Sequence, residues 1–397
     1  MLNNFVLEPK TKIIFGKDSE KTILKEVLKY GNKCLVHYDS SKHLLPLVTS
    51  TIKELISLNV EVYELGGVLP NPRLSLIYQG IELCREKDIN FVLAIGGGSV
   101  MDSAKFISFG VKADFDIWTY KSFTSFPHKV IPHGAISTLP GTGAEISSAC
   151  MIMNDLTERP IKGHFTHNDF RNDVVAINPE LSFTLPAVQT AAGSMDIISH
   201  CLEGYFSDTD NSYLLDGYME NVIKTVMKNC KKCLDNPSDY DARGTLWLSS
   251  LMPMDSYVTA STKPDWVVHN IEKPITVLSG GTHGRTLSVL TLAWIRFMYK
   301  KNIKQFIRWA VNCMDVDYDM YDPESTVLQG IERFENWCKS VGLPTRLSEI
   351  NVKEDIFEEA AELALKVAGF KGREGTIGMI SKLTFDEMIE IYHIANN

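Results

Sequence analysis

The chain has 397 residues, a length that suits two or three domains, each with its own buried core. Apolar residues make up 44% and charged residues 22%, as in ordinary globular proteins, which excludes collagen-like, coiled-coil and disordered classes. Forty lysines and arginines against 49 aspartates and glutamates give a net charge of -9. Because an acidic surface repels nucleic-acid phosphates, we expect no nucleic-acid partner.

The sequence also predicts a cytoplasmic protein. No stretch reaches the roughly 20 uncharged apolar residues that a membrane span needs, and the start of the chain lacks the apolar segment of a signal peptide. Eight cysteines spread over the whole chain do not resemble a secreted disulfide framework. Cys230 and Cys233 have CxxC spacing but no second such pair to complete a zinc site, so we interpret them as two reduced thiols at an exposed helix end.

The first half of the chain alternates short β-rich runs with helical patterns, as the βαβ units of a parallel sheet do. The expected strands are residues 34–38, 60–63, 91–95, 135–139 and 174–177, and the expected crossover helices are residues 44–58 and 73–87. After about Thr184 we find long helical patterns, such as 187–206, 221–234 and 324–341, and no convincing strand. We therefore expect an α/β Rossmann-like nucleotide-binding domain over residues 1–185 and an all-helical domain over residues 186–397.

A glycine triplet follows the expected strand 91–95. Gly96, Gly97 and Gly98 let the backbone approach a bulky anion, and the helix that begins near Ser99 points its free N–H groups at that anion. Ser99 and Asp102 also have the spacing of a capping box. Glycine turns after strands are common, but this one lies between a buried strand and a helix, which favours phosphate binding.

A second glycine-containing turn carries Thr138 and Thr142, whose hydroxyls suit a pyrophosphate or a nicotinamide amide, although a plain loop explains them as well. Two such turns suggest a dinucleotide. Asp39 follows the strand 34–38, where a carboxylate can bind a ribose diol; its alternative role is to form a turn or cap a helix. A carboxylate there would disfavour a 2′-phosphate by about 1–4 kcal/mol at a separation of ~4 Å, which favours NAD over NADP.

Asp196 and His200 are four residues apart on one expected helix and so leave the same face. Because apolar neighbours place that face against a core, the two groups must be paired or ligated, and a simple Asp–His hydrogen bond is an open alternative. Two further histidines, His269 and His283, complete a set of three nitrogens and one oxygen that suits Fe²⁺ or Zn²⁺.

Taken together, these motifs resemble the iron-containing (group III) alcohol dehydrogenases nearly from end to end, near the butanol dehydrogenase-like members. The matching segments are residues 4–16, Leu69-Pro-Asn71-Pro72, Gly96 to Ser99 with Asp102 and Lys105, residues 141–145, Asp196-x3-His200, and His269-x13-His283-Gly284.

The resemblance implies the dehydroquinate synthase-like fold of an α/β nucleotide-binding domain and an all-helical metal-binding domain. It implies that Asp196, His200, His269 and His283 are the metal ligands. By the same resemblance, the cofactor residues are Asp39, Asn71, Gly96, Gly97, Gly98, Ser99, Asp102, Thr138, Thr142 and Lys162. Lys162 is otherwise a solvated loop cation. The resemblance also implies a homodimer, to which an edge strand near residues 11–15 could contribute.

One position departs from the family. Many members have a histidine and a proline four residues after the third ligand, whereas this chain has Lys273-Pro274. An amine can take over the role of the imidazole in proton transfer only if its pKa is lowered. The proton therefore passes either through Lys273 or through water and ribose hydroxyls. We take Lys273 and His283 as the candidate catalytic residues.

The predicted function is hydride transfer between NAD, or NADP, and a small alcohol or aldehyde, with Fe²⁺ or Zn²⁺ bound. One alternative is an NAD- and metal-dependent lyase of the dehydroquinate synthase type, but only Lys263, Lys273 and Arg285 lie near the ligands in sequence to hold a phosphorylated substrate. The other alternative is a non-catalytic nucleotide-binding protein.

Overall fold

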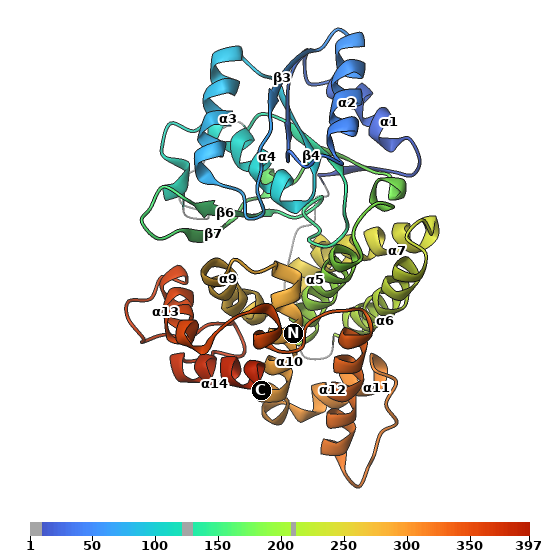
Figure 1. The fold of residues 1–397 in the computed structure, drawn as a ribbon, viewed down its shortest axis with the longest axis vertical. Coiled ribbons are helices and arrows are strands. Elements are labelled where there is room, and N and C mark those ends of the chain that lie inside the picture. The colour runs from blue at the N-terminus through green and yellow to red at the C-terminus, as the bar shows by residue number, and fades with distance from the viewer. Residues whose placement is uncertain (1–9, 121–129, 208–211) are drawn as a thin grey trace. The chain divides into compact units, whose positions relative to one another are not determined.

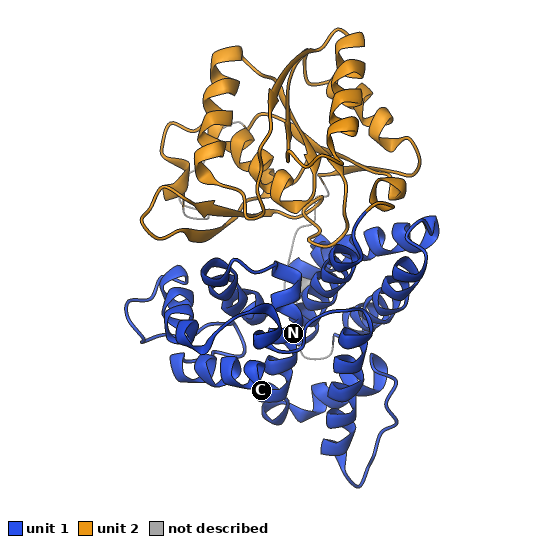
Figure 2. Cartoon of the chain, in the orientation of Figure 1, with its two compact units in different colours: residues 1–7, 185–397 blue, residues 8–184 orange. Residues whose placement is uncertain are grey.

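The computed structural model describes residues 10–120, 130–207 and 212–397. Within these residues the chain forms two compact units, one that ends at Thr184 and one that begins at Leu185 (Figure 2). The first contains a parallel sheet and the second is helical (Figure 1). Of the N-terminal strand expected at residues 4–16, residues 4–9 lie outside the described residues.

The first unit is built on a six-stranded parallel sheet in the order β1-β8-β5-β4-β2-β3. Its strands are β1 (Lys12–Phe15), β2 (Lys33–Tyr38), β3 (Glu61–Leu65), β4 (Phe91–Gly96), β5 (His133–Ser137) and β8 (Val174–Ile177). β4, β5 and β8 are buried along their whole length, as expected for strands that are covered on both faces. The predicted parallel α/β fold is therefore confirmed.

Helices cover both faces of this sheet. They are α1 (Ser19–Val27), α2 (Leu45–Ser57), α3 (Leu74–Lys87) and α4 (Gly98–Val111), with short 3-10 segments at Ile117–Thr119, Asn168–Phe170 and Pro179–Ser182. α1 and α2 bury Ile23, Leu24 and Leu55 in one core with Val36 and Leu93 of the sheet. α4 packs on β4 and β5 and against α3 on the opposite face (Figure 1).

An antiparallel hairpin, β6 (Ala149–Asn154) and β7 (Ile161–Thr166), is absent from the sequence prediction. β7 (IKGHFT) interrupts its apolar residues with Lys162 and His164, and β6 (ACMIMN) has a single β-branched residue, so neither strand has the β-rich apolar run that identifies the central strands. The hairpin also explains why the predicted capping box of Ser99 and Asp102 is wrong. The N-cap of α4 is Gly97, without a side-chain cap, and Asp102 Oδ2 instead accepts a hydrogen bond from Met151 N of β6 (2.9 Å).

The second unit is helical throughout its described residues, as predicted. Its helices are α5 (Ala187–Tyr205), α6 (Tyr213–Asp235), α7 (Tyr240–Leu251), α8 (Ser256–Ser261), α9 (Val267–Ser279), α10 (His283–Met298), α11 (Ile303–Asn312), α12 (Pro323–Ser340), α13 (Phe357–Val367) and α14 (Phe385–Asn396). Short 3-10 segments lie at Met252–Met254, Tyr299–Lys301, Leu347–Ile350 and Glu354–Ile356. α10 is almost entirely buried and packs against α5, α9, α12 and α14.

Two details of the helical unit differ from the prediction. α6 begins at Tyr213 rather than at residue 221, because the exposed Leu214 and Gly217 hide the apolar periodicity of its first turns. Cys230 and Cys233 are free, as expected, but they lie on the core side of α6 rather than at an exposed end. Burial raises the pKa of each thiol to about 11. No helix in the described part of the chain combines the length and apolar character that crossing a bilayer requires.

Candidate active site

α5 carries the first two predicted metal ligands. Asp196 and His200 leave the same face of this helix one turn apart, and they are only 4% and 9% exposed. Met195, Ile197 and Ile198 on the same helix belong to the core, which fixes the helix and with it the direction of both side chains.

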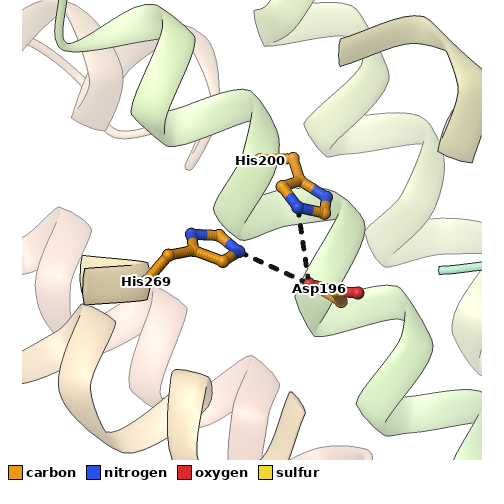
Figure 3. A group of neighbouring side chains, drawn as sticks. All are labelled: Asp196, His200 and His269. Carbon is orange, nitrogen blue, oxygen red and sulfur yellow. Dashed lines mark ion pairs between the residues drawn. The ribbon is translucent and has the colours of Figure 1, made fainter. Parts of the chain in front are cut away.

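Two other helices bring histidines to the same carboxylate. His269 lies in the first turn of α9, and His283 is the first residue of α10. The Nε2 atoms of His200, His269 and His283 lie 3.8, 3.6 and 3.5 Å from a single atom, Asp196 Oδ1. Figure 3 shows how the rings of His200 and His269 point toward Asp196. The structure therefore brings together all four residues that were predicted as ligands.

These distances fit a metal ion better than direct hydrogen bonds. Each is longer than the usual range of about 2.7–3.2 Å, and the buried atoms Asp196 Oδ1 and His269 Nε2 have no hydrogen-bond partner. Donors that surround an ion at about 2.0–2.2 Å in a tetrahedron lie about 3.3–3.6 Å apart. The ligand atoms of Asp196, His200 and His269 all lie within 4.8 Å of one another. The simple Asp–His hydrogen bond that the sequence left open is not formed.

The electrostatics of the four groups are those of a site that needs a cation. Burial would raise the pKa of Asp196, but the imidazoles around it outweigh burial and hold that pKa well below its usual range. Burial lowers the pKa of His200 to about 3. Burial acts in the same direction on His283, but Glu272 and Asp196 overcome it and raise its pKa to about 9. A neutral imidazole is the form that binds a metal.

Two buried glutamates that the sequence analysis missed contact the ligands. Glu203 Oε1 lies 3.1 Å from His269 Nδ1, and Glu272 Oε2 lies 2.7 Å from His283 Nδ1. A signal was present, because each glutamate follows a ligand histidine by three residues, at His200-Cys-Leu-Glu203 and His269-Asn-Ile-Glu272.

A glycine lets α10 approach α5. A Cβ at Gly284 would lie 2.2 Å from the backbone oxygen of Ala192 on α5, so only glycine fits there. This close approach places His283, one residue earlier, within reach of Asp196.

Lys273, the second candidate catalytic residue, lies one turn beyond His269 on α9. It is 7% exposed, and its Nζ donates a hydrogen bond to Asn270 Oδ1 (2.9 Å). The ring of Trp266, just before α9, packs edge-on against His200 and His269, with centroids 5.9 and 5.6 Å away.

The predicted nucleotide-binding residues lie in the other unit, several of them at the carboxyl ends of its strands. β2 and β4 are neighbours, but β2 leads outward to β3 while β4 leads through α4 to β5 on its other side. Such a reversal of strand order opens a crevice where nucleotides bind in sheets of this class. Asp39 follows β2, and Gly96, Gly97 and Gly98 join β4 to α4, so both lie at the carboxyl ends of the two strands between which the order reverses.

Hydrogen bonds and close packing within the loops fix the conformation of these residues. Asp39 Oδ1 accepts hydrogen bonds from the backbone and side chain of Ser41, so the predicted turn-forming role is present, and no described residue donates to its Oδ2. Thr138 N donates to Gly96 O (3.2 Å), and a Cβ at Gly98 would lie 2.6 Å from Thr142 Oγ1. The two predicted glycine turns therefore lie against each other.

The remaining predicted cofactor residues gather around the hairpin β6–β7. Asp102 binds Met151 N, and Lys162 on β7 pairs in register with Met153, whose N–H donates to the oxygen of Pro72 next to Asn71. Burial raises the pKa of Asp102, although Lys105 and Lys162 oppose that effect. Lys162 is 6% exposed, which excludes the solvated loop cation that the sequence left as an alternative.

Comparison with known proteins agrees with this arrangement. Residues 9–179 match the family model described as iron-containing alcohol dehydrogenase, and residues 190–395 match that of the C-terminal part of the same family. The chain belongs to the iron-containing alcohol dehydrogenase family. This is the family that the sequence motifs resemble.

Three members of the family illustrate the similarity. NADH-dependent butanol dehydrogenase A of Clostridium acetobutylicum is 32% identical over 96% of this chain and 97% of its own length. NADPH-dependent aldehyde reductase YqhD of Escherichia coli is 27% identical over 88% of this chain and 89% of its own. The crystal structure of NADH-dependent butanol dehydrogenase A from Thermotoga maritima has a TM-score of 0.91 and 29% identity, and the match covers 100% of this chain and 99% of that one.

Proposed function

We propose that this chain is an NADH-dependent alcohol dehydrogenase that interconverts small alcohols, such as butanol, with their aldehydes. The observation that carries the proposal is the convergence of three imidazole Nε2 atoms on one buried carboxylate oxygen. The names of the similar proteins, which are butanol dehydrogenases and an aldehyde reductase, support an oxidoreductase over the lyase and the non-catalytic alternatives.

In this proposal Asp196, His200, His269 and His283 hold one divalent ion, with iron favoured by the family and zinc also suited to the donor set. When bound, such an ion supplies Lewis-acid chemistry to an alcohol or carbonyl oxygen. The chain's own contribution is to fix the four donors on three packed helices. His283 has the most exposed side chain of the four, at 30%, which supports its place on the substrate side.

We assign the pyrophosphate to glycines 96 to 98 and the start of α4, because no side chain caps the first turn of that helix and a helix N-terminus attracts anions. We assign Asp39 to the adenosine ribose and Thr138 and Thr142 to the nicotinamide half, with Ser99 beside the phosphates. Asn71, Asp102 and Lys162 form the rest of the cofactor site around β6–β7. The carboxylate of Asp39 and the NADH-dependent relatives both support NAD over NADP.

A proton must also reach or leave the substrate oxygen. We assign this transfer to Lys273, because it is buried and lies one turn along α9 from His269. Its Nζ is held by Asn270, which would keep the ammonium in one place.

The test follows the consumption of NADH and of NADPH with a series of aldehydes, before and after chelation and after Fe²⁺ or Zn²⁺ is returned. We expect activity with butanal and NADH that is lost on chelation and restored by metal. The absence of turnover with every aldehyde would overturn the proposal.

The cofactor preference has its own test. Asp39→Asn removes the charge but keeps the oxygen that Ser41 binds, so it should raise the ratio of kcat/KM for NADPH to that for NADH by about tenfold, equivalent to about 1.4 kcal/mol. Glu64→Gln, on the neighbouring strand β3, removes the same charge and should leave the ratio unchanged. Higher activity with NADPH in the unmodified enzyme would contradict the role given to Asp39.

We also propose a homodimer in the cytoplasm. β1 is an edge strand of the described sheet, and Ile13 and Phe15 are each 41% exposed on it, which supports pairing with a second copy. All eight cysteines are free and buried, as suits a reducing compartment.

A further inference from the structure

Two glutamates outside the predicted ligand set contact the far side of two ligand histidines. Glu203 and Glu272 are 5% and 0% exposed, so both carboxylates are buried. A buried carboxylate costs several kcal/mol unless charged or hydrogen-bonded partners compensate. Their partners are the Nδ1 atoms of His269 and His283, the ring nitrogens that face away from Asp196.

Each of the two glutamates contacts the ligand histidine of another helix rather than the one on its own helix. Glu203 lies on α5, three residues after His200, but contacts His269 of α9; Glu272 lies on α9, three residues after His269, but contacts His283 of α10. Helices α5 and α9 therefore each supply ligands and also the carboxylate that contacts the ligand histidine of the next helix.

His200 differs from the other two histidines. Among the described residues, no carboxylate lies within ion-pair distance of its Nδ1, whereas a carboxylate oxygen lies 3.1 Å from His269 Nδ1 and 2.7 Å from His283 Nδ1. Asp196 and His200 share α5, so the helix backbone already sets their separation, whereas His269 and His283 come from other helices. The carboxylates thus accompany the two ligands whose place depends on packing between helices.

We propose that Glu203 and Glu272 are positioning residues of the metal site, an inference that rests on the ion proposed above. Glu203 accepts a hydrogen bond from Nδ1–H of His269, and the carboxylate of Glu272 forms an ion pair with Nδ1 of His283. Both contacts keep the proton on Nδ1 and leave the Nε2 lone pair facing the ion. Carboxylates in this position also make the imidazole a stronger ligand, and their loss costs roughly 10–100-fold in metal affinity.

Glu272 is the better residue for the test, because Glu203 has a second task. Both oxygens of Glu203 accept from the backbone at the start of α9, from Val267 N (3.1 Å) and His269 N (3.2 Å). A change at Glu203 would therefore disturb the helix as well as the ligand. Glu272 also accepts a hydrogen bond from the hydroxyl of Thr276 on the same helix.

The experiment measures Co²⁺ affinity of the full chain, stripped of metal, by competition with a chromophoric chelator, together with the visible spectrum of the Co²⁺ protein. Glu272→Gln loses the charge but keeps an acceptor oxygen, and Glu272→Leu loses both. We expect affinity to fall about tenfold in the first and about 100-fold in the second, with a changed Co²⁺ spectrum in both. Thr276→Val removes the hydroxyl contact of Glu272 but not its contact with His283, so the affinity of this variant should stay within threefold of that of the unmodified protein.

Urea unfolding of the metal-free variants separates positioning from folding, because a positioning residue alters affinity without a matching loss of metal-free stability. Unmodified affinity and spectrum in Glu272→Leu would overturn the proposal, as would an equal loss of affinity in Thr276→Val. If the unmodified chain binds no Co²⁺ and His283→Ala changes nothing, the metal site itself is wrong and this inference fails with it.

Discussion

Gly284→Ala adds one methyl group at a residue that is not a ligand, and it should lower metal affinity by displacing His283. The new Cβ would lie 2.2 Å from Ala192 O and 2.7 Å from Ala192 C, both backbone atoms of α5 that cannot rotate away. Side-chain Cβ atoms essentially never approach closer than 3.0 Å, so α10 must move by about 0.8 Å, the difference between 3.0 and 2.2 Å. His283, one residue earlier, must move with it.

That displacement is large for a metal ligand, because bond lengths in such sites hold to about 0.2 Å. We expect metal affinity to fall at least tenfold. Crowding of this kind costs about 1–3 kcal/mol, and the helical preference of alanine returns at most about 1 kcal/mol, so the metal-free protein should lose up to about 2 kcal/mol. Competition with a chelator and urea unfolding measure the two effects separately.

Gly217→Ala is the matched control. Gly217 lies in α6, and a Cβ there meets nothing within 4 Å, so the same substitution should stabilise the protein by about 0.5–1 kcal/mol and leave metal affinity unchanged. If Gly284→Ala is as stable and binds metal as tightly as Gly217→Ala, the close approach of α10 and α5 does not position His283.

Three further changes probe other parts of the account. Burial lowers the pKa of His37 to about 4, so its contribution to stability is complete above its unfolded pKa of about 6.5 and is lost as the pH falls toward 4. His37 alone should lower the free energy of unfolding by about 2 kcal/mol between pH 7.5 and 5, and His37→Gln should reduce the total drop by that amount. Equal pH dependence in both proteins would exclude His37 as the cause. Gly98→Ala places a Cβ 2.6 Å from Thr142 Oγ1, so the KM for NADH should rise about tenfold with no change in metal affinity. An unaltered KM would show that the glycines do not bind the phosphates. Lys273→His should move the pH–rate profile toward neutrality, whereas an unchanged profile would exclude Lys273 from proton transfer.

The central strands and most of the long helices could be predicted from the sequence because their burial leaves a simple pattern. β4 is apolar along its whole length between polar flanks, and α5 repeats apolar residues at helical spacing. The hairpin β6–β7 leaves a weaker pattern, since β7 carries polar residues and β6 has only one β-branched residue. Its contact with Asp102 joins residues 49 positions apart, which local spacing cannot reveal.

Some residues of the candidate metal site could likewise be predicted from the sequence, and others could not. Asp196 and His200 follow from the geometry of a single helix, and the remaining two histidines from residue type and the family resemblance. Glu203 and Glu272 act across helices, so neither could be paired with its histidine before the packing of α5, α9 and α10 was known. Only the repeated spacing of histidine and glutamate hinted at them.

Anomalous X-ray diffraction from crystals grown with Fe²⁺ or Zn²⁺ locates the bound ion itself. We expect one peak about 2.0–2.2 Å from Asp196 Oδ1 and from the Nε2 atoms of His200, His269 and His283. An active enzyme whose only anomalous peak lies elsewhere, or that shows none, would contradict this expectation.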